Sequence, residues 1–223
     1  MKHRNSTIFI SSLVILTILI TGCSNWSNTA KGAVIGTGAG AAVGAVVGKT
    51  LGNTAAGAIA GAVVGGTTGA IIGRNMDRKA AEMKREMEGV TIQRVEEGIA
   101  VSFDSGILFD VDSANLRAEG YNNLQKLANI LKRDDETILM IVGHTDSTGD
   151  ENYNLRLSER RAQSAKTYLG SQGLPSSRIQ IVGRGELEPI ADNSTVDGRQ
   201  KNRRIEVAIF ASPEYINRIS ASN

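Results

Sequence analysis

The pattern of apolar and polar residues changes near Val90, from helical periods to short apolar runs that alternate with amphipathic segments. The short runs are typical of strands, and we expect them at 91–95, 99–103, 107–109, 138–142, 179–182 and 205–210. Two amphipathic segments predict helices, one ending near Leu131 and one over about 152–169. This order predicts an α+β domain over residues 90–211, with helices packed on one face of a mixed β-sheet.

Glycine recurs at every fourth position before this domain, with one slip of the register near Asn53. The glycines are Gly32, Gly36, Gly40, Gly44, Gly48, Gly52, Gly57, Gly61, Gly65, Gly69 and Gly73. Four residues is a helical period, so each set forms a bare stripe, which close backbone packing must compensate. We predict a helical hairpin over residues 32–73, in which Lys49 is the only charge. Its length and neutrality permit insertion into a bilayer, its few large apolar side chains argue against insertion, and a disordered linker is the remaining alternative.

Residues 74–89 are rich in charge, and Met76, Ala80, Met83 and Met87 recur among the charges at helical spacing. The stripe predicts a helical spacer between the hairpin and the domain. After the last expected strand we expect a C-terminal tail over residues 212–223.

The first residues combine Lys2, His3 and Arg4 with a short apolar run at 8–20, as in a secretory signal peptide. The small residues before Cys23 resemble a bacterial lipobox. The resemblance implies that residues 1–22 are removed, that Cys23 is diacylated, and that residues 23–31 form a lipid-anchored linker in the outer membrane. The alternative is an uncleaved anchor helix, for which the run is short.

Composition restricts the classes of partner and cofactor. The 25 basic and 23 acidic side chains give a net charge of +2, which argues against a nucleic-acid partner. One cysteine and two histidines are too few for a structural zinc site, so we expect no metal and no cofactor.

Candidate chemistry appears where Asp146 follows an apolar strand and Arg161 lies on the next helix. At about 100° per residue, Arg161 falls about 80° from the centre of the apolar face and Arg160 about 180° away, so Arg160 should face water. A carboxylate and a guanidinium together suit a ligand that carries an ammonium and a carboxylate on one carbon. A direct Asp146–Arg161 ion pair is the structural alternative.

These residues resemble the signature of the OmpA-like peptidoglycan-binding domain, as do Phe109-Asp110, Gly183-Arg184-Gly185-Glu186 and the closing Asn202-Arg203-Arg204. The glycine repeat resembles the glycine-zipper region of outer-membrane lipoproteins. The resemblance implies an OmpA-like fold and binding of the diaminopimelate of the peptidoglycan stem. The peptidoglycan-binding residues that it implies are Asp146, Arg161, Asp110, Arg203, Thr148 and Asn202.

We therefore expect a lipid-anchored outer-membrane protein that is not an enzyme, with a periplasmic domain that tethers the membrane to the cell wall. One alternative makes the glycine hairpin a self-associating assembly or pore-forming element, with wall binding as a locator. An enzyme of wall turnover would need a nucleophile beside His144, and no motif supplies one, so we expect His144 to be a loop packing residue. A stator-like channel would need an acidic residue between Gly32 and Gly73, where the sequence has none.

Overall fold

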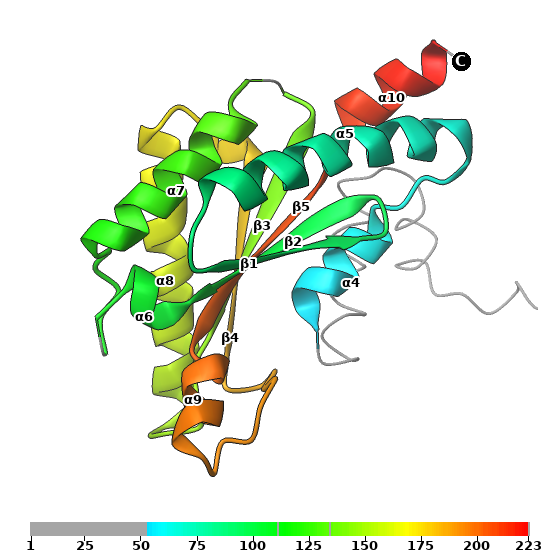
Figure 1. The fold of residues 1–223 in the computed structure, drawn as a ribbon. Coiled ribbons are helices and arrows are strands. Elements are labelled where there is room, and N and C mark those ends of the chain that lie inside the picture. The colour runs from blue at the N-terminus through cyan, green and yellow to red at the C-terminus, as the bar shows by residue number, and fades with distance from the viewer. Residues whose placement is uncertain (1–52, 111, 134, 223) are drawn as a thin grey trace, which may run out of the picture. The chain divides into compact units, whose positions relative to one another are not determined.

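A computed structural model of the chain describes residues 53–110, 112–133 and 135–222 (Figure 1). The expected signal peptide, the linker with Cys23 and the first arm of the hairpin lie outside the described residues. No helix of the described part of the chain is both long and apolar enough to cross a bilayer.

The centre of the fold is a five-stranded sheet in the order β1-β2-β5-β3-β4. Its strands are β1 (Val90–Val95), β2 (Gly98–Asp104), β3 (Thr137–His144), β4 (Ile179–Gly185) and β5 (Arg204–Ala211). Only the β3–β4 pair is parallel among these neighbours, and the other three pairs are antiparallel. A parallel pair requires a crossover, which helix α8 (Glu151–Ser171) supplies. The mixed sheet with packed helices confirms the predicted fold class.

The main core lies on one face of the sheet, under α8, α7 (Ala118–Leu131) and α5 (Gly66–Glu86) (Figure 1). Leu139 and Ile141 of β3 point into this core, and Met140 and Val142 point to the other face. This alternation is the strand period of two. The strand expected at 107–109 is wrong: residues Ser105–Leu108 form the short helix α6, which the side chain of Asp104 caps at Gly106.

The expected spacer is part of the domain, because α5 begins at Gly66 and continues without a break beyond Gly73. Its stripe of Ile72, Met76, Ala80 and Met83 is buried in the main core. The stripe is apolar because it packs on the sheet. Asp77 and Arg78, between its members, face solvent, whereas Lys79 is buried and pairs with Glu136. The change of composition at Arg74 is therefore not a structural boundary.

The predicted second arm of the hairpin is not one helix. Helix α4 (Thr54–Gly61) ends before Gly65 and Gly66, whose φ angles of 72° and 63° lie in the left-handed region. Glu97, in the β1–β2 turn, accepts hydrogen bonds from the amides of Val64 and Gly65 and holds this connection. Helices α4 and α5 consequently lie on opposite faces of the sheet (Figure 1).

Helix α4 also corrects the prediction that helices cover one face only. Its Ala55, Ala58 and Ile59 bury Met140 and Phe210 on the second face of the sheet. These small side chains allow a close approach, and a Cβ atom on Gly98 would lie 2.5 Å from the side chain of Ile59. The glycine-rich sequence thus serves packing against the domain at this point.

Two further helices replace expected loops. Residues Pro213–Ala221 form α10 instead of a free tail, and its Tyr215 and Ile216 complete the main core. Residues Val196–Asn202 form α9, which the side chain of Thr195 caps, within the connection between β4 and β5. The one-turn helix η1 (Ser176–Arg178) lies directly before β4 in the chain.

Candidate functional site

The candidate site lies in the loop between β3 and α8, at the carboxyl end of β3. Asn154, on the first turn of α8, donates its side-chain amide to the carbonyls of Asp146 and Thr148 at 3.3 Å and 3.1 Å. Asp150 caps the helix by accepting from the amide of Tyr153, and Gly149 turns the chain with a φ of 95°. The loop is therefore fixed by hydrogen bonds on both sides of Asp146.

Gly143, just before this loop, is required for packing and not for the turn. A Cβ atom at this position would lie 2.2 Å from the backbone oxygen of Ser158 on α8. The absence of a side chain lets α8 lie directly against the end of β3. The hydroxyl of Ser158 in turn accepts the amide of Gly185 at 2.9 Å, which joins the helix to β4.

The carboxylate of Asp146 pairs with Arg203, whose Nη1 lies 2.5 Å from Oδ2. Its other oxygen accepts the backbone amide of Thr148 at 2.9 Å. Burial raises the pKa of Asp146, but the hydrogen bonds from Arg203 and Thr148 outweigh burial and hold the pKa below its usual range. The group is therefore a carboxylate at neutral pH. The alternative of a direct Asp146–Arg161 ion pair is replaced by the pair with Arg203.

Arg161 is buried on α8, with 3% of its surface exposed. Its Nε donates to the carbonyl of Ser113 at 2.8 Å, and its guanidinium lies 5.5 Å from the ring centroid of Phe109. Burial lowers the pKa of Arg161, but an arginine stays protonated in proteins. Arg160 is exposed, in agreement with the helical angles, whereas Arg161 lies deeper than the rim position predicted for it.

Charge is unevenly distributed in this site. Arg203 is near enough to Arg161 for its positive charge to lower the pKa of Arg161, while Asp112 has the opposite effect. Two guanidinium groups thus lie within electrostatic reach of each other. One of them is paired with Asp146, and Asp112 adds a second carboxylate. This arrangement favours a further anionic oxygen pair from outside the protein. Asp112 was missed in the sequence, where it belongs to no recognised motif.

Asp112 lies opposite the first turn of α8. It has a φ of 56°, and its carboxylate accepts a hydrogen bond from the hydroxyl of Tyr153. This hydrogen bond raises the pKa of Tyr153, so the hydroxyl stays protonated. The contact holds the 109–117 segment, which contains Phe109 and Ser113, against the helix that carries Arg161.

Asp110 and Thr148, which were also predicted to bind the ligand, are both exposed to solvent. Asp110 has 72% of its side chain exposed, and its Oδ1 is 3.7 Å from Nη1 of Arg117. This loose, exposed pair leaves the carboxylate available to another cation. Thr148 is exposed and directs its backbone amide at Asp146.

Asn202 differs from its predicted role as a binding residue. Its Oδ1 accepts from the amides of Ile190 and Ala191, and its Nδ2 donates to the Ala191 carbonyl and to Asn193. The side chain is fully buried and all of its hydrogen-bonding positions are used. Asn202 therefore holds the β4–β5 connection and positions its neighbour Arg203, and it has no group left for a ligand.

His144 is fully buried on the second face of the sheet, and neither ring nitrogen has a hydrogen-bond partner. Its Nε2 lies 3.9 Å from Oε2 of Glu206. Burial, followed by the positive charges of Arg204 and Arg184, lowers the pKa of His144 well below its usual value. A neutral, enclosed imidazole fits the expectation of a packing residue and not of an acid or base.

Two family models match this chain. The model of the OmpA family matches residues 108–203, and that of the YMGG-like Gly-zipper matches residues 1–77. The first match contains Asp110, Thr148, Asp146, Arg161 and Arg203, and the second contains the glycine repeat. Both resemblances expected from the sequence are thereby confirmed.

Known proteins with similar sequences include two lipoproteins. The probable lipoprotein YiaD of Escherichia coli (strain K12) is 38% identical over 136 residues, which are 60% of this chain and 62% of YiaD. The outer-membrane lipoprotein YfiB of Pseudomonas aeruginosa is 38% identical over 116 residues, 52% of this chain and 69% of YfiB. The chain thus spans about three fifths of one of these relatives and two thirds of the other. The outer-membrane location of YfiB agrees with the location predicted for this chain.

A similar solved structure is the cell wall anchor of the T6SS from Pseudomonas aeruginosa. It is 28% identical and superposes with a TM-score of 0.54, covering 61% of this chain and 97% of the anchor. The nearly complete coverage of that chain indicates that the OmpA-like fold is present here without major gaps.

Proposed function

The chain belongs to the OmpA family, and on that premise we propose that residues 90–211 bind peptidoglycan while diacylated Cys23 holds the outer membrane. The protein then tethers the membrane to the wall without covalent chemistry. The observation that carries the proposal is the buried Arg161 beside the Asp146–Arg203 pair. The matched family and the similarity to a cell wall anchor support the same ligand.

The proposed ligand group is the free amino-acid end of diaminopimelate in the stem peptide. Its carboxylate would be bound by the guanidinium of Arg161, with Arg203 adding a second positive charge. Its ammonium would be bound by Asp146, with Asp110 or Asp112 at the solvent edge. A ligand that carries both an ammonium and a carboxylate thus offers an opposite charge to the aspartates and to the arginines of the site.

A role as an enzyme finds no support in the site. His144 is neutral and enclosed, and Asp146 is a firmly paired carboxylate with a lowered pKa, which makes it a poor proton donor or acceptor near neutral pH. Both groups are better suited to holding a ligand than to transferring a proton. We therefore propose binding without hydrolysis.

Sedimentation of the membrane-extracted protein with purified sacculi tests the proposal. Arg161→Ala or Asp146→Ala should each weaken binding about tenfold to a hundredfold, because each removes a charge-assisted contact. Leu187→Ala is the control, since Leu187 is 52% exposed beyond β4 and touches none of these charges. Undiminished binding by both site variants would contradict the assignment.

The choice of sacculi tests the ligand itself. Wall material with lysine in place of diaminopimelate lacks the free amino-acid end, and it should bind more weakly than wall material with diaminopimelate. Binding should also decrease with salt, because part of the site is exposed to solvent. Equal binding to both kinds of sacculi would contradict diaminopimelate recognition while leaving wall binding in place.

A second candidate function is assembly through the glycine zipper, which the match of residues 1–77 favours. Residues 54–61 are packed on the sheet as α4, so this function would rest on residues 32–52. Chemical cross-linking in membranes, with the full chain and a variant without residues 32–52, separates the two functions. Loss of cross-linked oligomers with unchanged sacculus binding would assign assembly to the glycine segment.

A further inference from the structure

A groove of about 420 Å³ runs along the side of α8, towards its C-terminal half, between this helix, α7 and the segment that precedes α7. It is lined by Ala114, Asn115, Leu116, Tyr121, Gln163, Ser164, Thr167, Tyr168 and Ser171. None of these residues carries a charge. The groove contains none of the residues assigned above to the stem-peptide site.

An aromatic pair forms the apolar part of this groove. The rings of Tyr121 and Tyr168 lie edge to face, with centroids 4.8 Å apart and an angle of 71° between their planes. Tyr121 is 45% exposed, so part of its ring faces solvent and is free to contact a ligand. An aromatic ring in this position provides apolar contact, with a hydroxyl at its edge.

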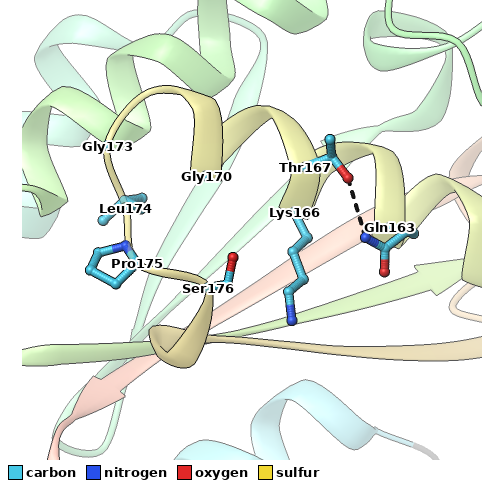
Figure 2. Close-up of a pocket in the computed structure, with 8 residues that line it drawn as sticks. All are labelled: Gln163, Lys166, Thr167, Gly170, Gly173, Leu174, Pro175 and Ser176. Atoms are coloured by element: carbon cyan, nitrogen blue, oxygen red, sulfur yellow. Dashed lines mark hydrogen bonds between the residues drawn. The ribbon is translucent and has the colours of Figure 1, made fainter.

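Neutral hydrogen-bonding groups form the polar part. Asn115, Gln163 and Thr167 are exposed and offer amide and hydroxyl groups. Gln163 and Thr167 form a 3.2 Å hydrogen bond with each other, seen along α8 in Figure 2. Such groups, next to an aromatic ring, suit a neutral polyhydroxyl ring that has both C–H faces and equatorial hydroxyls.

The neighbouring grooves along α8 differ in charge. The groove of Figure 2 contains Lys166, and a groove beside β4 contains Glu159, Arg160 and Arg184. Charged walls favour ionic peptides or anions, whereas the uncharged wall with its tyrosine pair favours a sugar. Gln163 and Thr167 line both the Tyr121 groove and the groove of Figure 2, so the tyrosine side makes the difference and favours a neutral ligand.

The groove adjoins the stem-peptide site. Arg161 donates to the carbonyl of Ser113, and the next residue in the chain, Ala114, already lines the groove. On α8, Ser164 and Tyr168 follow Arg161 by three and seven residues, about 4.5 to 10 Å along the helix axis. The free end of diaminopimelate is joined to the sugar through its own side chain, a glutamate linked through its side chain, and an alanine. Together these can span more than about 10 Å when extended. A stem peptide bound at Arg161 can thus bring its sugar to Tyr121.

We propose that the Tyr121 groove is a subsite for the N-acetylated sugar that carries the stem peptide. The proposal rests on the proposed function, since it places a second part of the same ligand. The lactyl carboxylate of that sugar is consumed in the amide bond to the peptide, so the bound sugar is neutral and matches the uncharged wall. The stem site would then supply the charged contacts and the groove would supply contacts to the glycan.

Isothermal titration of the full chain with two probes tests the subsite. One probe is a disaccharide-tripeptide muropeptide, and the other is the same tripeptide without sugar. The unmodified protein should bind the muropeptide about 3- to 10-fold more tightly, the gain expected from one aromatic contact. Tyr121→Ala should remove that gain and leave the affinity for the tripeptide unchanged, whereas Tyr121→Phe should keep most of it.

Gln163→Leu provides a second variant whose effect does not depend on the tyrosine pair. It keeps the size of an exposed side chain and removes its hydrogen-bonding groups, so it should also reduce the gain. Equal affinity of the unmodified protein for both probes would overturn the subsite and leave the proposed function intact. An equal loss for both probes in Tyr121→Ala would overturn it too. Binding of neither probe would overturn the proposed function and the subsite with it.

Discussion

The guanidinium of Arg203 lies 2.5 Å from the carboxylate of Asp146, although 57 positions separate the two residues in sequence. Asp146 belongs to the β3–α8 loop, and Arg203 follows α9 directly before β5. The antiparallel pairing of β3 with β5 brings these ends of the chain together, since Gly143 lies opposite Ile205. The pair holds Asp146 as a carboxylate, and Arg161 takes no part in it.

Arg203→Ala should raise the pKa of Asp146 above its value in the unmodified protein. The hydrogen bond from Arg203 is the main effect that opposes burial, and its loss leaves burial in control. A pH titration of the Asp146 carboxyl carbon by NMR measures this change. Arg203→Lys should raise the pKa less, because the charge remains. An unchanged pKa in Arg203→Ala would contradict the observed pairing.

Acid should weaken folding through Asp146 only at low pH. The folded-state pKa is lowered, so the carboxylate stabilises the fold above its unfolded value of 3.8, and this stabilisation disappears as the pH falls through the folded value. Unfolding in urea between pH 2 and pH 5 measures the effect. Asp146→Asn should show a flatter profile below pH 4, and an identical profile would contradict the assignment of this stabilisation to Asp146.

Arg161→Ala should destabilise the domain as well as weaken wall binding. It removes the hydrogen bond to the Ser113 carbonyl and the contact with the Phe109 ring, at a cost of about 1 to 3 kcal/mol. Urea unfolding at pH 7 measures this cost. Arg160→Ala is the matched control, because the neighbouring arginine is exposed and should change the free energy of unfolding by less than about 0.5 kcal/mol. Equal effects of the two variants would contradict the buried role of Arg161.

Helical periodicity predicted the part of the site that lies on one element. The period of α8 placed Leu155, Ser158, Ala162, Ala165 and Leu169 on the buried side. The last four are buried, and Leu155 is half-buried. The same angles separated Arg160 from Arg161. Such predictions succeed because the period of a helix depends on local geometry alone.

Contacts between distant segments were not predictable in this way. The stripe of α5 was visible in the sequence, but whether it faced the sheet or solvent depended on a strand order that the sequence does not state. The position of α4 on the sheet was hidden, because its alanines and glycines carry no amphipathic signal. The structural role of Asn202 was hidden too, because its hydrogen-bond partners lie elsewhere in the chain. In each case the missing information was tertiary.

Glu188→Ala should release the beginning of α4 from the sheet. Glu188 is buried and accepts from the amide of Thr54 at 3.0 Å, and its carboxylate lies 3.2 Å from Nε of Arg184. Its removal leaves a partly buried Arg184 without its carboxylate, at a cost of about 3 kcal/mol or more. Hydrogen exchange should become faster in the amides of α4. Urea unfolding should show the lower free energy of unfolding.

Glu159→Gln is the control for this variant, because Glu159 is exposed on α8. Thr54→Val separates the contribution of the Thr54 hydroxyl from that of the charge, since it removes the hydroxyl that Arg184 and Glu188 both contact. Unchanged exchange in α4 of Glu188→Ala would show that the apolar contacts of Ala55, Ala58 and Ile59 alone hold the helix on the sheet.

His144 should make the free energy of unfolding depend on pH in a higher pH range than the one in which Asp146 acts. Its folded-state pKa lies well below the unfolded value of 6.5, so the unfolded chain takes up a proton first as the pH falls. The free energy of unfolding should then decrease below pH 6.5, by up to about 1.4 kcal/mol for each pH unit, until the folded-state pKa is reached. Above pH 6.5 the effect is absent, because the imidazole is neutral in both states.

His144→Leu should flatten this decrease between pH 6.5 and pH 4.5, a range in which the Asp146 carboxylate is not yet protonated. At pH 7.5 the variant should be at least as stable as the unmodified protein, because neither nitrogen of His144 has a partner to lose. Urea unfolding at pH 7.5, 6.5, 5.5 and 4.5 measures both effects. Tyr153→Phe serves as a control with no ionisation in this range. If His144→Leu keeps the slope of the unmodified protein, a different group carries the acid sensitivity, and the buried neutral state of His144 is contradicted.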